Sequence, residues 1–115
     1  MKRLIAAAGH SARAFRALAR TEKAFQQELV LLVLALPLGW WLSDDWRGYA
    51  LLVGAVLMLV LVEVLNTAIE AACNAVTRER RPEIGLAKDC GSLAVAIAAV
   101  MAGGIWLLAL VDRFA

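Results

Sequence analysis

The segment from Gly91 to Val111 contains 21 consecutive residues without a charged side chain. A helix of about 20 residues is roughly 30 Å long, which matches the hydrocarbon thickness of a lipid bilayer. Two further apolar runs precede it, at 29–42 and from about Tyr49 to Val62. The first of these has only 14 residues, so it spans a bilayer only if its helix begins near Ala24. The sequence therefore predicts an all-α membrane protein with three transmembrane helices.

The composition also indicates that these helices lie in lipid. Hydrophobic residues make up 63% of the 115 residues, against roughly 45–50% in soluble domains. A soluble chain of this length has too little interior to bury so much apolar surface. The net charge of +2 is too small to indicate nucleic acid as a partner. The two cysteines, Cys73 and Cys90, match no metal-site or redox spacing.

Residues 1–23 combine an apolar helical stripe with six basic side chains. Such an amphipathic helix lies in the lipid headgroup layer, where anionic lipid attracts it. A cleaved signal peptide is the alternative, but its basic region would be unusually long, and Trp40 and Trp41 lie where small residues precede a cleavage site. We expect a single domain, with a surface helix at 1–23, membrane helices at 24–42, 46–76 and 89–112, and a cytoplasmic loop at 77–88. The second membrane helix is expected to extend into the cytoplasm.

Basic residues set the expected orientation in the membrane. Of the 12 Lys and Arg residues, six precede the first membrane helix, four lie between the second and third, one lies in the first turn and one lies near the C-terminus. The positive-inside rule then places the N-terminus and the 77–88 loop in the cytoplasm. Tryptophan and tyrosine gather toward the opposite side, as aromatic residues do at an interface.

A polar helix face follows the second apolar run. At 3.6 residues per turn one face carries Glu63, Asn66, Thr67, Glu70 and Asn74. An ionisable residue within a membrane helix is a functional hypothesis by default, because it is costly in lipid without a partner. Glu70 alone is equally compatible with a solvated helix end, and Asn66 with a hydrogen bond between helices.

The predicted topology brings other polar residues to the same cytoplasmic end, namely Glu22, Glu28, Lys88, Asp89 and Ser92. Carboxylate pairs bind Mg²⁺ together with substrate phosphates, and a lysine meets phosphate as a point charge. Lys88 and Asp89 are also compatible with a helix cap. No known nucleotide-binding loop motif is present. The residues alone do not separate a lipid-modifying enzyme from a small transporter or channel subunit.

Two motifs carry a resemblance to a known family. EVLNTAIEA at 63–71 and GLAKDCGSLAV at 85–95 resemble the signature of the prokaryotic diacylglycerol kinases. The resemblance extends to AAAGHSARAFRAL and TEKAFQQE near the start of the chain. It implies a homotrimer in the bacterial inner membrane, with active sites shared between neighbouring subunits at the cytoplasmic interface. The implied reaction moves the γ-phosphoryl group of ATP to the primary hydroxyl of diacylglycerol, giving phosphatidic acid.

The resemblance also implies roles for individual residues. Glu63 would be the catalytic base, Asn66 would orient Glu63 or the acceptor, and Glu22 and Glu70 would hold the ATP-bound Mg²⁺. The implied nucleotide contacts are Arg3, His10, Glu22, Glu70, Glu79, Arg80, Arg81, Lys88 and Asp89. The implied lipid-substrate contacts are Ala8, Ser11, Ala12, Glu28, Tyr49, Glu63, Ser92 and Trp106.

The chain departs from the family pattern at His10, Leu86 and the Arg80-Arg81-Pro82 loop, so we expect any difference in nucleotide affinity to arise there. Two alternatives remain. One is an undecaprenol kinase of the same family, and the other is a non-enzymatic ion-binding membrane protein.

Overall fold

The computed structural model describes all 115 residues as four helices and short connections. The helices are α1 (Lys2–Thr21), α2 (Lys23–Leu42), α3 (Trp46–Val76) and α4 (Pro82–Phe114). The last three are long and apolar enough to cross a membrane. The predicted all-α membrane fold with an N-terminal helix and three membrane helices is therefore confirmed, while the trimer and the division into membrane and cytoplasmic segments stay predictions.

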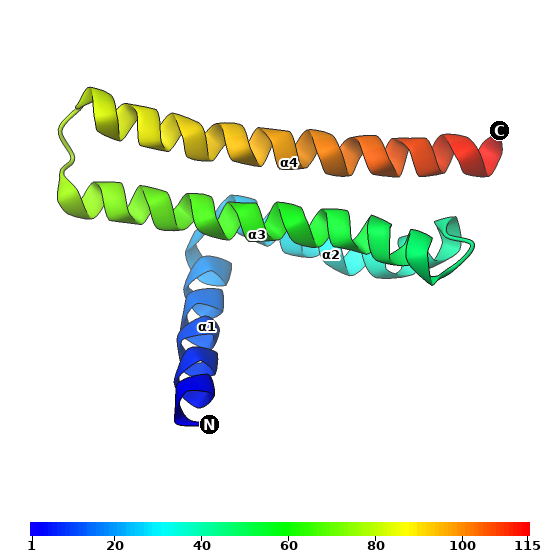
Figure 1. The fold of residues 1–115 in the computed structure, drawn as a ribbon, viewed down its shortest axis with the longest axis horizontal. Helices are drawn as coiled ribbons and strands as arrows, with labels where there is room; N and C mark the ends of the chain where they lie inside the picture. The colour runs from blue at the N-terminus through cyan, green and yellow to red at the C-terminus, as the bar shows by residue number, and fades with distance from the viewer.

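α3 is the central helix of the bundle. α4 runs antiparallel beside it, and α2 packs along the half of α3 nearer to its N-terminus (Figure 1). α1 leaves the bundle at a steep angle at the level where α2 begins (Figure 1). Beyond that level α3 and α4 continue together without α2, so the junction of α1 and α2 lies beside the middle of α3.

The corner between α1 and α2 is made by one residue, Glu22. Its backbone is extended, with φ −103° and ψ 108°, so it ends one helix and begins the next. The rings of Phe15 and Phe25 pack edge to face across the corner, with centroids 5.6 Å apart. Gln26 Nε2 also donates a hydrogen bond to the carbonyl of Ala19 at 2.8 Å. These contacts fix the direction in which α1 leaves the bundle.

The turn between α2 and α3 is short because Asp45 caps the following helix. Its carboxylate accepts a hydrogen bond from the backbone N–H of Gly48 at 2.9 Å, which satisfies one of the free donors of the first turn. Pro37 lies inside α2, and the helix continues through it to Leu42.

The connection between α3 and α4 corrects one expectation. We expected a loop at 77–88 and a third membrane helix from residue 89, whereas α4 begins at Pro82 and only residues 77–81 are non-helical. Proline suits the first turn of a helix because its missing N–H would have no partner there. Lys88 and Asp89 therefore project from a helix and not from a loop.

The buried seam between the helices is narrow, since only 14 of the 115 residues are buried. Six of these 14 are alanine or glycine, which lets the backbones approach closely: Ala35, Gly39, Ala55, Gly91, Ala98 and Ala102. Large apolar side chains point outward along all three membrane helices. Lipid tails or neighbouring protein chains are the surroundings that suit this outer surface.

Candidate functional site

Two buried carboxylates mark the centre of the site. Glu63 on α3 is 6% exposed, Glu28 on α2 is 8% exposed, and the two lie within electrostatic range of each other. No Lys or Arg pairs with either of them, because the only ion pair in the chain joins Arg81 to Glu79 at 3.6 Å. Glu28 Oε1 is buried without a hydrogen-bond partner. Buried carboxyl groups are costly unless paired or hydrogen-bonded, so this pair needs a cation, a donor or a proton from outside the chain.

Two more carboxylates, on Glu22 and Glu70, also lie in the region of Glu63. Glu22 reaches the site from the corner between α1 and α2, and Glu70 lies about 10 Å further along α3. Both are half-buried, and both are within electrostatic range of Glu63. The structure therefore brings the four acids of the predicted site into one region from three segments of the chain. No three potential metal-binding side chains come close enough to form a metal cage within the chain.

Asn66 lies one turn beyond Glu63 and faces α4. Its side-chain oxygen is buried against the backbone of Gly91 and has no hydrogen-bond partner. The Asn66 side chain also interacts with the Glu63 carboxyl group. Thr67 Oγ1 donates to the backbone carbonyl of Glu63 at 3.0 Å and so lies over the same turn. The predicted polar face of α3 is thus the face that meets the neighbouring helices.

A basic groove lies at the end of the bundle where α3 passes into α4. It has a volume of about 500 Å³ and is lined by Thr77, Arg78, Glu79, Arg80, Arg81, Ile84, Gly85, Lys88 and Asp89. Four of these side chains are basic and two are acidic, so the groove carries an excess of two positive charges. Such an excess suits a polyphosphate. The groove gathers five of the predicted nucleotide contacts, from Glu79 to Asp89.

Lys88 is held in place at the edge of this groove. Its ammonium group donates a hydrogen bond to Asn74 Oδ1 of α3 at 2.9 Å. Because the acceptor is a neutral amide, the bond fixes the side chain without cancelling its charge. Asn74 was predicted to share the polar face of α3, but its pairing with Lys88 was not foreseen, since one helix's periodicity does not reveal which residue of another helix it meets.

Arg3 and His10 lie apart from the groove. Both are exposed on α1, which projects away from the bundle (Figure 1). His10 Nδ1 is hydrogen-bonded to the guanidinium of Arg13. The structure of one chain therefore does not bring these two predicted nucleotide contacts to the others.

The predicted lipid contacts fall into three groups. Ala8, Ser11 and Ala12 are exposed along α1, and Ser92 is exposed on α4 directly after Gly91. Glu28 and Glu63 form the buried pair described above. Tyr49 and Trp106 lie far along the bundle, since Tyr49 is 14 residues from Glu63 on α3, or about 21 Å.

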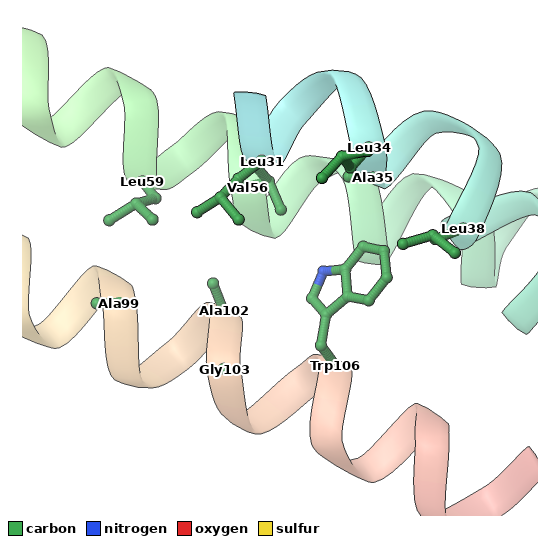
Figure 2. Close-up of a pocket in the computed structure, with 10 residues that line it drawn as sticks. All are labelled: Leu31, Leu34, Ala35, Leu38, Val56, Leu59, Ala99, Ala102, Gly103 and Trp106. Carbon is green, nitrogen blue, oxygen red and sulfur yellow. The ribbon is translucent and has the colours of Figure 1, made fainter. Parts of the chain in front are cut away.

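Trp106 closes one end of an apolar cavity between α2, α3 and α4. The cavity has a volume of about 390 Å³, and Figure 2 shows the indole ring reaching across from α4 toward the other two helices. The other lining residues are Leu31, Leu34, Ala35, Leu38, Val56, Leu59, Ala99, Ala102 and Gly103. The indole N–H donates to the Leu52 carbonyl of α3 at 3.0 Å. The cavity is lined by apolar side chains, and it begins about one helical turn from the carboxylates, at Leu31 and Leu59.

Comparisons with known proteins point to one family. The family model described as prokaryotic diacylglycerol kinase matches residues 9–110. The chain is 40% identical over 112 residues to a diacylglycerol kinase of Escherichia coli K12, covering 97% of this chain and 92% of that protein. It is 37% identical over 106 residues to a diacylglycerol kinase of Pseudomonas aeruginosa, covering 92% and 86% of the two chains. A diacylglycerol kinase of Haemophilus influenzae is 31% identical over 103 residues, covering 90% and 87%.

Proposed function

This chain belongs to the prokaryotic diacylglycerol kinase family, a family of lipid kinases, and we propose that it phosphorylates the primary hydroxyl of 1,2-diacylglycerol with ATP. The products are phosphatidic acid and ADP. Its location is the bacterial inner membrane, with the N-terminus in the cytoplasm and the active site at the cytoplasmic interface. The basic residues of the 77–81 connection and of α1 support this orientation.

Glu63 is the general base of the proposed reaction. It accepts the proton of the lipid hydroxyl while the hydroxyl oxygen attacks the γ-phosphorus, and the bond from that phosphorus to the β,γ-bridging oxygen breaks as ADP leaves. The burial of Glu63 without a basic partner supports this role, because no ion pair competes for its oxygens. Asn66 orients the Glu63 carboxyl group or the acceptor hydroxyl, and its interaction with Glu63 supports that assignment.

Glu22 and Glu70 are the residues proposed to hold Mg²⁺ with ATP. Neither forms an ion pair within the chain, and both face the region around Glu63. Two carboxylates without a full cage fit Mg²⁺, which is commonly held by one or two carboxylates together with substrate phosphates. When bound, the ion would neutralise charge on the transferred phosphoryl group.

The basic groove is the proposed site of the ATP phosphates. Lys88 lies at its edge as a fixed positive charge, and Arg78, Arg80 and Arg81 line the rest of it together with Glu79 and Asp89. The proposed contacts of Arg3 and His10 with nucleotide require a neighbouring subunit, because α1 carries them away from the groove of their own chain. A homotrimer with shared active sites meets this requirement, and the outward apolar faces of the membrane helices are compatible with it.

The single observation that carries the proposal is the buried, unpaired Glu63 within the family's ExxNxxxE spacing. The test is incubation of the purified protein with γ-labelled ATP and Mg²⁺ in mixed micelles that contain either 1,2-diacylglycerol or undecaprenol. Labelled phosphatidic acid supports the proposal. Labelled undecaprenyl phosphate alone would assign the chain to the polyprenol branch, and no lipid-dependent consumption of ATP would contradict the kinase activity itself.

A further inference from the structure

Gly91 is the point of closest approach between α4 and the polar face of α3. It is one of only three buried residues of α4. A methyl group built on its Cα would overlap Asn66 Oδ1 and would lie 3.3 Å from Asn66 Cγ and 3.8 Å from Asn66 Cα. The space that a side chain would occupy at Gly91 is therefore filled by the Asn66 amide.

This contact fixes the direction of the Asn66 side chain. Its oxygen is buried against α4 with no hydrogen-bond donor, so its NH₂ group lies on the arm of the planar carboxamide that is turned away from Gly91. Glu63 precedes Asn66 by one helical turn, so the two side chains share one face of α3. An amide held in this way offers a donor to the carboxylate and no competing acceptor.

We propose that Gly91 is a positioning residue for phosphoryl transfer, whose missing side chain lets α4 press the Asn66 amide into the orientation that serves Glu63. The inference rests on the proposed roles of Glu63 and Asn66. It goes beyond them because Gly91 touches neither nucleotide nor acceptor and acts only through Asn66.

The other glycines of α4 differ from Gly91 in this respect. An added methyl group at Gly85, Gly103 or Gly104 would meet no atom of another helix within 4 Å. Gly is a poor helix former compared with Ala, so helix propensity alone favours alanine at all four positions. Gly104 is the matched control, because it is exposed on the same helix and lies away from the carboxylates.

The test compares Gly91→Ala with Gly104→Ala in mixed micelles, with kcat and the KM for ATP measured separately. Displacement of a positioned group commonly costs between about 10- and 100-fold in rate. We expect kcat of Gly91→Ala to fall by that factor while its KM for ATP changes less than about twofold, because the basic groove is untouched. Gly104→Ala retains wild-type values of both. An unchanged kcat in a folded Gly91→Ala protein would overturn the proposal.

A double variant separates a positioning role from a general packing role. In the Asn66→Ala background the overlapping amide is gone, so addition of Gly91→Ala is expected to lower kcat by less than about twofold further. A full additional loss would mean that Gly91 does not act through Asn66. If Gly91→Ala alone fails to fold, recovery of folding in the double variant supports the same contact, and failure to recover overturns it.

The proposed role of Asn66 and the proposed role of Gly91 can be contradicted separately. Wild-type kcat in Asn66→Ala would remove the proposed role of Asn66, and the assignment of Gly91 would fall with it. An impaired Asn66→Ala together with an unimpaired Gly91→Ala would leave the proposed function standing and overturn only the inference about Gly91.

Discussion

The hydrogen bond between Lys88 and Asn74 leads to a quantitative prediction about nucleotide binding. Asn74→Ala removes the acceptor that holds the Lys88 ammonium group at 2.9 Å. The lysine keeps its charge but becomes free to rotate. Because the bond lies at the edge of the basic groove, we expect the substitution to weaken ATP binding and to leave the phosphoryl-transfer step almost unchanged.

The size of the effect follows from the freedom that Lys88 regains. A lysine side chain loses up to about 2 kcal/mol of rotamer entropy when it is fixed. In the native protein part of that cost is met during folding, through the bond to Asn74. In Asn74→Ala that part also falls on ATP binding, so we expect a loss of about 0.7–1.4 kcal/mol, or roughly 3- to 10-fold in the KM for ATP.

The assay is ATP saturation of lipid phosphorylation in mixed micelles at saturating diacylglycerol. Asn74→Gln keeps a neutral amide acceptor and is expected to raise the KM for ATP less than Asn74→Ala does. Lys88→Met keeps a long unbranched side chain without the charge, and in that background Asn74→Ala should have no further effect on the KM. A wild-type KM in Asn74→Ala, or a full additional loss in the Lys88→Met background, would refute the reasoning.

Three further predictions concern the carboxylates and the apolar cavity. Glu63→Gln is expected to lower kcat by about 10²- to 10⁴-fold, the usual contribution of a general base. Its oligomeric state, measured by light scattering, should not change. Wild-type-like turnover would show that Glu63 is not the base. Glu70→Gln should raise the Mg²⁺ concentration for half-maximal activity by about tenfold or more. Chelation of Mg²⁺ should stop lipid phosphorylation by the wild-type protein. An unchanged Mg²⁺ titration of Glu70→Gln would mean that Glu70 is not a metal ligand. Trp106→Phe loses the hydrogen bond to the Leu52 carbonyl. It should lower the free energy of unfolding in detergent by about 0.5–1.5 kcal/mol and leave the KM for ATP unchanged. An effect on that KM without loss of stability would contradict the placement of Trp106 far from the groove.

Much of the fold follows from the lengths of the apolar runs. The 21-residue run that begins at Gly91 can only cross a bilayer, and it became the larger part of α4. The 14-residue run at 29–42 was ambiguous by itself, and it spans only because α2 begins at Lys23. The start of α4 was wrong in the sequence interpretation, because Pro82 is compatible both with the end of a helix and with the first turn of one.

The site was predicted less completely, and the reason is geometric. Helical periodicity placed Glu63, Asn66 and Glu70 on one face, and the chain topology returned Glu22 and Glu28 to the same level. Which residue of α4 each of them meets depends on the rotation and the axial shift between helices, and no single-helix pattern encodes these. The pairing of Asn74 with Lys88 and the close approach of Gly91 to Asn66 therefore needed the structure.

Glu22 has an extended backbone, so its acidic side chain lies at the joint between α1 and α2 and not within a helix. A carboxylate at a joint moves whenever the angle between the two helices changes. The Phe15–Phe25 packing and the bond from Gln26 to the Ala19 carbonyl hold this angle, and with it the reach of the Glu22 oxygens toward Glu63. The basic amphipathic sequence of α1 predicts contact with lipid headgroups, and that contact would act on the same joint that carries the acid.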